Sequence, residues 1–157
     1  MYRGTAYLHK NEEMGATNSF ESEVLRLILL NEAIADLGDA AGVQPSAADG
    51  NVYICLLTQD PGEDGDITNE AAWGGYARAA VPRGAAGWSE ANGKALNFAN
   101  INFPECTGGS ETDTHFGICK TPTGDDMVFH GELPGPLLVS IEVQPQFGPN
   151  ALAINLD

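Results

Sequence analysis

The first strong pattern along the chain is helical. From Asn18 onward, apolar residues recur every three or four positions, and Glu21 stands three residues after Asn18, the spacing of a helix capping box. The apolar positions of this face are Phe20, Val24, Leu27, Ile28 and Ile34, and Leu25, Leu29 and Leu30 widen it. Gly38 supplies a stop. The pattern predicts a helix over about residues 19–37, whose broad apolar face is buried on the chain's own sheet or against another chain.

After Gly50 the hydrophobic period changes from helical spacing to two. Segments rich in β-forming residues alternate with clusters of Gly, Pro, Asn and Asp. The seven predicted strands are 52–58, 75–81, 95–103, 112–119, 127–133, 137–143 and 151–156. Short strands at regular spacing indicate a mainly β protein, an antiparallel β-sandwich of jelly-roll or immunoglobulin-like type, instead of alternating βαβ units.

These patterns divide the chain into four segments. Residues 1–17 carry no sustained period and are typical of an extended N-terminal arm. The helix occupies residues 18–38, a linker of small residues occupies 39–50, and the β-sandwich domain occupies 51–157. No repeat with a fixed period indicates a solenoid or a propeller.

Size and charge exclude several classes of function. The chain has 157 residues, which fits one globular domain, and its formal net charge is −15. Such a charge repels phosphate backbones and anionic membrane surfaces, so we expect neither nucleic acid nor membrane as a partner. The longest apolar run is far shorter than the roughly 20 residues of a membrane span, and no signal peptide is expected.

The three cysteines leave the redox state open. Cys55, Cys106 and Cys119 are an odd number without a CxxC spacing, which argues against a secreted disulfide framework. Reduced thiols are the first expectation. One disulfide plus a spare thiol, or a disulfide to a neighbouring subunit, are the alternatives.

The acidic loop from Asp60 to Glu70 resembles a calcium loop only in part. Its weak calcium candidates are Asp60, Asp64, Asp66 and Glu70. Gly62 stands where an EF-hand has its third ligand, and Glu70 arrives one residue early for the bidentate glutamate. A solvated acidic turn between strands is therefore the favoured interpretation, with an irregular calcium site as the alternative.

No motif for catalysis or cofactor binding is present. Ser110 lacks the Gly-x-Ser-x-Gly context of a serine nucleophile, and the Gly-Gly pairs lack both the Walker lysine and the dinucleotide spacing. We expect a protein that is not an enzyme and that binds no cofactor.

Isolated bulky and charged side chains supply interface candidates. Arg78 lies in an otherwise neutral strand, where its guanidinium either grips a carboxylate or carbonyls, or points outward. Trp73 and Trp88 are anchors at turns, and either can cap the core or contact another subunit. The full set of candidates is Phe20, Val24, Leu27, Ile28, Trp73, Arg78 and Trp88.

The β region also carries a resemblance to a known family. Val52-Tyr-Ile-Cys-Leu-Leu-Thr-Gln-Asp-Pro-Gly-Glu-Asp-Gly65 resembles the "LYVSLHTADPGEAG" opening of small tailed-bacteriophage virion proteins often labelled tail fibre proteins. Later motifs follow in the family's order: Gly75-Tyr-Ala-Arg78, Ala86-Gly-Trp88, Ile101-Asn-Phe-Pro104, Thr114-His-Phe-Gly-Ile118, His130-Gly-Glu-Leu133 and Asn150-Ala-Leu-Ala-Ile-Asn-Leu156. The resemblance covers about residues 51–157 and departs from the family at Cys55, Gln59 and Cys119.

The resemblance implies a compact β-domain that assembles in many copies and has no catalytic residues. A fibre usually needs a long shaft and a receptor-binding tip, and a short acidic domain with an arm and a helix suits a protein that decorates a capsid from outside. We therefore expect a virion structural protein assembled in the host cytoplasm, first of all a capsid decoration (cement) protein that bridges major capsid subunits and forms a homo-oligomer. A tail, collar or fibre-associated adaptor is the alternative, followed by a calcium-dependent glycan-binding module.

Overall fold

The helical segment begins where the sequence indicates and ends early. The computed structural model describes residues 15–156. Its helix α1 spans Asn18–Leu25 and continues into one π-helical turn, Arg26–Leu30. Thr17 is the N-cap, and its side chain accepts a hydrogen bond from the backbone N–H of Phe20. Residues 1–14 of the predicted arm lie outside the described residues.

The predicted continuation of the helix to about residue 37 is wrong. Asn31 adopts a left-handed conformation with φ of 59°, which ends the helical hydrogen bonding. Its side-chain amide bonds the backbone of Ser46 and the carboxylate of Asp49, so the turned chain is held in place. Ile34 instead forms an isolated antiparallel bridge with Val43. A local polar contact network therefore outweighs the apolar periodicity of residues 31–37.

The described residues beyond the helix form nine strands, which confirms the mainly β prediction. They are β1 (Asn51–Leu57), β2 (Ala79–Pro82), β3 (Trp88–Ala91), β4 (Lys94–Asn97), β5 (Ile101–Asn102), β6 (Ser110–Cys119), β7 (Met127–Ser140), β8 (Gln146–Phe147) and β9 (Ala153–Ile154). β3 and β8 were not predicted. The predicted strand 95–103 divides into β4 and β5, and the predicted strands 127–133 and 137–143 are parts of the single strand β7.

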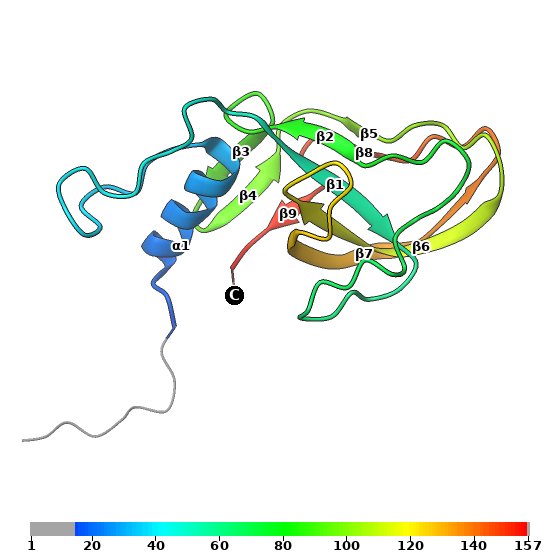
Figure 1. Ribbon diagram of the computed structural model, residues 1–157, viewed down its shortest axis with the longest axis horizontal. Coiled ribbons are helices and arrows are strands. Elements are labelled where there is room, and N and C mark those ends of the chain that lie inside the picture. The colour runs from blue at the N-terminus through cyan, green and yellow to red at the C-terminus, as the bar shows by residue number, and fades with distance from the viewer. Residues whose placement is uncertain (1–14, 157) are drawn as a thin grey trace, which may run out of the picture.

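All strand pairs are antiparallel and the arrangement is sandwich-like. The main sheet has the order β2-β1-β6-β7, β3-β4-β9 form a second sheet, and β5 pairs with β8. Helix α1 lies at one end of the molecule beside β3 and β4, and the β6–β7 pair curves toward the other end (Figure 1). Among the described residues, no helix combines the length and hydrophobicity that a membrane crossing requires.

A bulge in β7 explains why one strand looked like two. His115 pairs with Glu132 and Asp113 pairs with Leu137, so one residue of β6 stands opposite the four residues 133–136 of β7. Pro134 and Pro136 lie in this interval, and proline has no N–H to donate to a ladder. The chain therefore leaves the ladder at the prolines and rejoins it afterwards.

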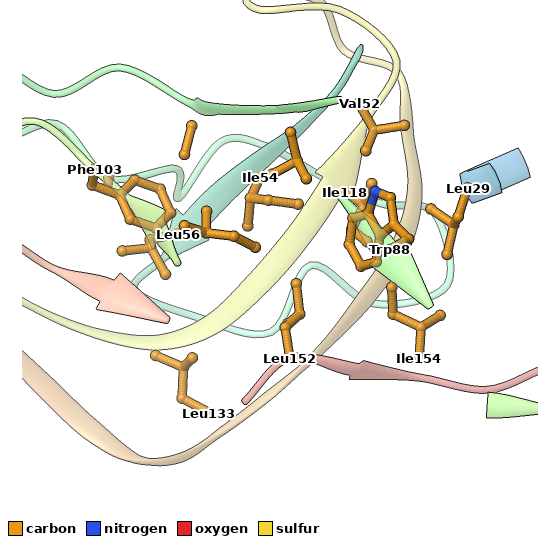
Figure 2. Close-up of a cluster of buried hydrophobic side chains, with 14 of the residues drawn as sticks. Leu29, Val52, Ile54, Leu56, Trp88, Phe103, Ile118, Leu133, Leu152 and Ile154 are labelled. Carbon is orange, nitrogen blue, oxygen red and sulfur yellow. The ribbon is translucent and has the colours of Figure 1, made fainter. Parts of the chain in front are cut away.

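The core lies between the sheets. Val52, Ile54 and Leu56 of β1 face it, together with side chains from the other strands and from the helix (Figure 2). The alternate residues of β1 face the other way; of these, Cys55 and Leu57 are fully buried and Tyr53 is half-buried. Cys55 and Leu57 form a second, smaller cluster with Cys119, and Tyr53 and Met127 pack against it. β1 is thus covered on both sides, so its sequence is almost continuously apolar.

Candidate functional site

The best-defined polar cluster of the protein surrounds Arg78. The guanidinium of Arg78 binds Glu70 in a two-pronged ion pair, with Nε to Oε1 and Nη2 to Oε2 both at 2.7 Å. Its Nη1 donates to the carbonyl of Thr121 at 2.9 Å. The hydroxyl of Tyr76 donates to Oε1 of Glu70 at 2.8 Å and accepts a bond from the N–H of Leu56. These contacts tie the loop after β1 to β1 itself and to the β6–β7 turn.

Electrostatics stabilise the charged state of this cluster. The hydrogen bonds to Glu70 raise the pKa of Arg78 against the opposing effect of burial. Burial, and then the charge of Glu70, raise the pKa of Tyr76, which therefore stays protonated. Arg78 has only 8% of its surface exposed and binds a carboxylate and a carbonyl inside the chain, the first of the two alternatives for this residue.

Trp73 and Trp88 are also core residues. Their exposed fractions are 4% and 1%, so neither lines the surface in this conformation. Trp73 packs edge-on against the ring of Tyr76, with centroids 4.8 Å apart, and Trp88 lies in the main core beside Leu29 of the π-helical turn (Figure 2). Of the two roles that the sequence leaves open for these residues, the burial of both rings agrees with the core role.

The structure does not gather the four calcium candidates of the acidic loop. Asp60 accepts from the N–H of Gly62, Asp66 accepts from the N–H and hydroxyl of Thr68, and Glu70 belongs to the Arg78 cluster. Across residues 15–156, no group of three or more His, Cys, Asp or Glu side chains has a metal-binding arrangement. Asp60 and Asp66 thus shape local turns, since their carboxylates bond backbone N–H groups two residues further along the chain.

Arg83 is a second clamp, which the sequence analysis missed. Its guanidinium donates to the carbonyls of Leu27 and Ile28, both at 2.6 Å, at the end of the helical segment. It also donates to the hydroxyl of Ser46 and to the carbonyl of Asp49. Arg83 therefore fastens the helix and the following loop to β2. Arg78 directly precedes β2 and Arg83 directly follows it. The pattern that singled out Arg78, a guanidinium next to an uncharged strand, would therefore have identified Arg83 too.

The helical interface candidates have mixed positions. Leu25 and Leu29, at 0% exposure, form the face buried against the sheet. Phe20 is 37% exposed, and Val24, Leu27 and Ile28 are half-buried. The helix therefore packs on its own domain, and only the flank around Phe20 remains open to a neighbour.

An apolar opening lies along β7. A cavity of about 290 Å³ opens where the proline bulge separates β7 from β8, and Leu133, Leu137 and Phe147 are among its lining residues. Leu138, near the end of the same strand, is exposed at 63% and points to the face opposite to its neighbour Leu137; Ile141, exposed at 61%, directly follows the strand. β7 is an edge of the main sheet. We call the seven residues of this region the β7 surface: Leu133, Pro134, Leu137, Leu138, Ile141, Pro145 and Phe147.

Acidic side chains flank the β7 surface. Glu132 precedes Leu133, and Glu142 follows Ile141; both are exposed. The N–H of Glu142 bonds the carbonyl of Cys106, which places the exposed Glu105 nearby. Leu133 and Pro145 are buried, Leu137 and Phe147 are half-buried, and Leu138 and Ile141 are exposed. A partly exposed apolar region with a charged rim is typical of a contact surface for another protein.

Comparison with models of known protein families gives a match over most of the chain. The model of the family described as Podophage GP4 fiber I protein gp80 matches residues 29–155, from the π-helical turn to the last strand. No curated protein matches the chain.

Proposed function

The chain belongs to the family of the podophage GP4 fiber I protein gp80 and is thus a bacteriophage virion structural protein, and we propose that it serves as a fibre-associated subunit. The family match covers the β-domain almost completely, which supports a structural role for that domain. Capsid decoration, the more specific expectation from the sequence, gains no support from the family's description, whereas the fibre-associated alternative does.

The β7 surface is the observation that carries the proposed mode of action. It combines an apolar cavity, two exposed aliphatic side chains and an edge strand of the main sheet. In this proposal, a different virion protein with an apolar centre and a basic rim covers it. A second copy of this chain fits less well, because two copies would bring their acidic rims together.

The net charge of −15 supports this choice of partner. Arg26, Arg78 and Arg83 are bound to acidic or carbonyl groups of the chain itself, which leaves few cations for self-association. Association with a basic partner gains from charge complementarity and weakens as salt screens it.

We also propose that the protein has no enzymatic activity. The polar clusters of the described residues, around Arg78 and Arg83, are bound to groups of the chain and hold loops and the helix in place. These contacts stabilise the fold, and neither of the two clusters contains a nucleophilic side chain placed beside a general base.

The experiment that tests the position in the particle is a copy number. Quantitative mass spectrometry of purified phage particles should find this chain in tens of copies or fewer, in a fixed ratio to the tail and fibre proteins. Hundreds of copies, in proportion to the major capsid protein, would reject the fibre-associated role in favour of capsid decoration. Absence from purified particles would reject both.

A further inference from the structure

Two buried thiols face each other on the side of the main sheet away from the main core. The sulfur atoms of Cys55 on β1 and Cys119 on β6 are 3.8 Å apart, within hydrogen-bonding distance for thiols. Both residues are fully buried, and both thiols are free. Tyr53 pairs with Cys119 and Cys55 pairs with Gly117, so the two cysteines are diagonal neighbours on one face of adjacent strands.

Gly117 leaves the space that the thiol of Cys55 occupies. A Cβ atom at position 117 would lie 2.8 Å from the sulfur of Cys55 and 2.6 Å from the terminal carbon of Met127. Any larger residue there would push the Cys55 side chain away from its present position. The glycine opposite Cys55 therefore allows the two sulfurs to approach each other.

The surroundings favour ionisation of one of the two thiols. Hydrogen bonding with Cys55, and the positive charge of Arg78, lower the pKa of the Cys119 thiol against the opposing effect of burial. When Cys119 is ionised, Cys55 acts as the donor, and this hydrogen bond together with burial raises the pKa of Cys55. A thiolate is the form in which cysteine reacts with oxidants.

Cys106 is excluded from this pair by its position. It is buried in the main core, on the other side of the sheet, and its thiol donates to the carbonyl of Gly108 at 3.4 Å. A disulfide needs sulfur atoms about 2.0 Å apart. The sulfurs of Cys55 and Cys119, 3.8 Å apart, therefore have to approach each other by about 1.8 Å, through changes of the two side chains and of the adjacent strands. Pairing with Cys106 would require a rearrangement of the sheet.

We infer that Cys55 and Cys119 are a redox pair that closes into an intrachain disulfide when the protein meets a peroxide. The Cys119 thiolate attacks hydrogen peroxide, the O–O bond breaks, and a sulfenic acid forms with release of hydroxide, which takes up a proton to become water. The Cys55 thiol then attacks the sulfenic sulfur; the S–S bond forms, the S–O bond breaks and a second water leaves. The two sulfurs are oxidised and the peroxide is reduced.

The pair suits a protein that is made in one redox environment and functions in another. Thiols stay reduced in a cytoplasm, whereas disulfides persist on virions outside the cell. The bond would join β1 to β6 at the centre of the main sheet, after folding is complete. This inference is independent of whether the chain lies on the fibre or on the capsid.

The test uses the full chain, purified in reductant and then treated with hydrogen peroxide. We expect the number of free thiols to fall from three to one and the mass to fall by two hydrogen atoms. A non-reducing peptide map should join the Cys55 peptide to the Cys119 peptide. Closure of a loop of this length predicts a rise of the thermal midpoint by roughly 5–15 °C, reversed by dithiothreitol.

Two variants serve as matched controls. Cys106→Ala should keep the mass loss, the cross-linked peptide and the thermal shift, and Cys119→Ala should lose all three. If Cys119→Ala does not fold, the mass and the peptide map of the oxidised wild-type chain still show whether the bond between Cys55 and Cys119 forms. Three free thiols after peroxide treatment, a bond that includes Cys106, bonds only between chains, or irreversible oxidation without a bond would each overturn the inference.

Discussion

The two sides of the main sheet are stabilised in different ways. One side is the large apolar core, in which Leu56 packs with rings and aliphatic side chains from several strands and from the helix. The other side has only a small cluster around Cys55 and Leu57, beside the Arg78–Glu70 ion pair, whose charges act on both Cys55 and Cys119. On the small side, hydrogen-bonded charges replace the missing layer of apolar residues.

The two sides also differ in whether their buried charged groups have partners. Arg78 and Glu70 satisfy each other on the small side. Asp113 of β6 pairs in register with Leu137, which packs against the main core, so the carboxylate lies on the main-core side. It is fully buried, and neither of its oxygens has a hydrogen-bond partner within the described part of the chain. The comparison teaches that pairing, and not location alone, decides what a buried charge costs.

Adjacent leucines give the strongest test of the comparison. Leu56 and Leu57 are buried to the same degree, at 1% and 0% exposure, but face opposite sides of β1. Leu56→Ala should lower the free energy of unfolding by about 4 kcal/mol, because a cavity in a large rigid core collapses poorly. Leu57→Ala should cost about 2–3 kcal/mol, since the loop above it can relax. Urea denaturation measures both, and a larger loss for Leu57→Ala would contradict the account.

Removal of the guanidinium of Arg78 tests the polar closure of the small side. Arg78→Ala leaves Glu70 with little solvent and without its cation, and a loss of about 3 kcal/mol is expected. Arg78→Lys keeps the charge but not the two-pronged geometry, so it should recover only part of the loss. Denaturation curves of both variants within about 0.5 kcal/mol of wild type would show that the ion pair does not hold this side.

A glycine substitution tests how tightly the small side is packed. Gly117→Ala should destabilise the protein by about 2 kcal/mol, because the added methyl group meets both Met127 and Cys55. Gly108→Ala is the matched control, since a Cβ there meets no atom within 4 Å. Thermal denaturation that finds equal effects for the two variants would contradict this packing.

The unpaired carboxylate of the main-core side predicts a dependence on pH. Burial, and secondly the charge of Glu111, raise the pKa of Asp113 to about 7. The folded state then binds a proton that the unfolded state has lost, so stability falls as pH rises from about 4 to 7. Wild type should be about 2 kcal/mol less stable at pH 8 than at pH 5 through this group, and Asp113→Asn should remove that difference. An unchanged pH profile in the variant would rule out Asp113 as the titrating group.

The smallest effect on stability is expected at the β7 surface, where the effect is on assembly. Leu138→Asp should change the free energy of unfolding by less than about 0.5 kcal/mol, because the side chain is largely exposed. In phage complemented with the variant, the chain should be depleted from particles. Leu37→Asp, at an exposed loop position away from β7, is the control and should be incorporated normally. Normal incorporation of Leu138→Asp would remove the β7 surface from the proposal.

Sequence predicted the parts of the fold that local pattern controls. β1 was located almost to the residue, because both of its faces are apolar and Gly50 and Asp60 bound it. The start of the helix was predicted from local sequence as well, because the apolar repeat and the capping residues stand together there. Its end was missed because Asn31 turns the chain through contacts with Ser46 and Asp49, which are distant in sequence.

Less of the candidate site could be predicted from the sequence. The cavity of the β7 surface depends on Phe147 and Leu133 meeting beside a proline bulge, and their separation in the chain gives no local signal. The prolines did give a signal, but they were interpreted as the end of a strand. Arg78 was recognised as a lone guanidinium, but its partners Glu70 and Thr121 are set by the fold.

The proposed role is tested most directly by locating the chain in the phage particle. A cryo-electron microscopy map of the intact particle, with an antibody fragment against this chain as a marker, shows where the domain sits. The account predicts density for the β-domain at the tail or its fibres, with β7 turned toward a different protein. Density spread over the capsid lattice would contradict the fibre-associated role.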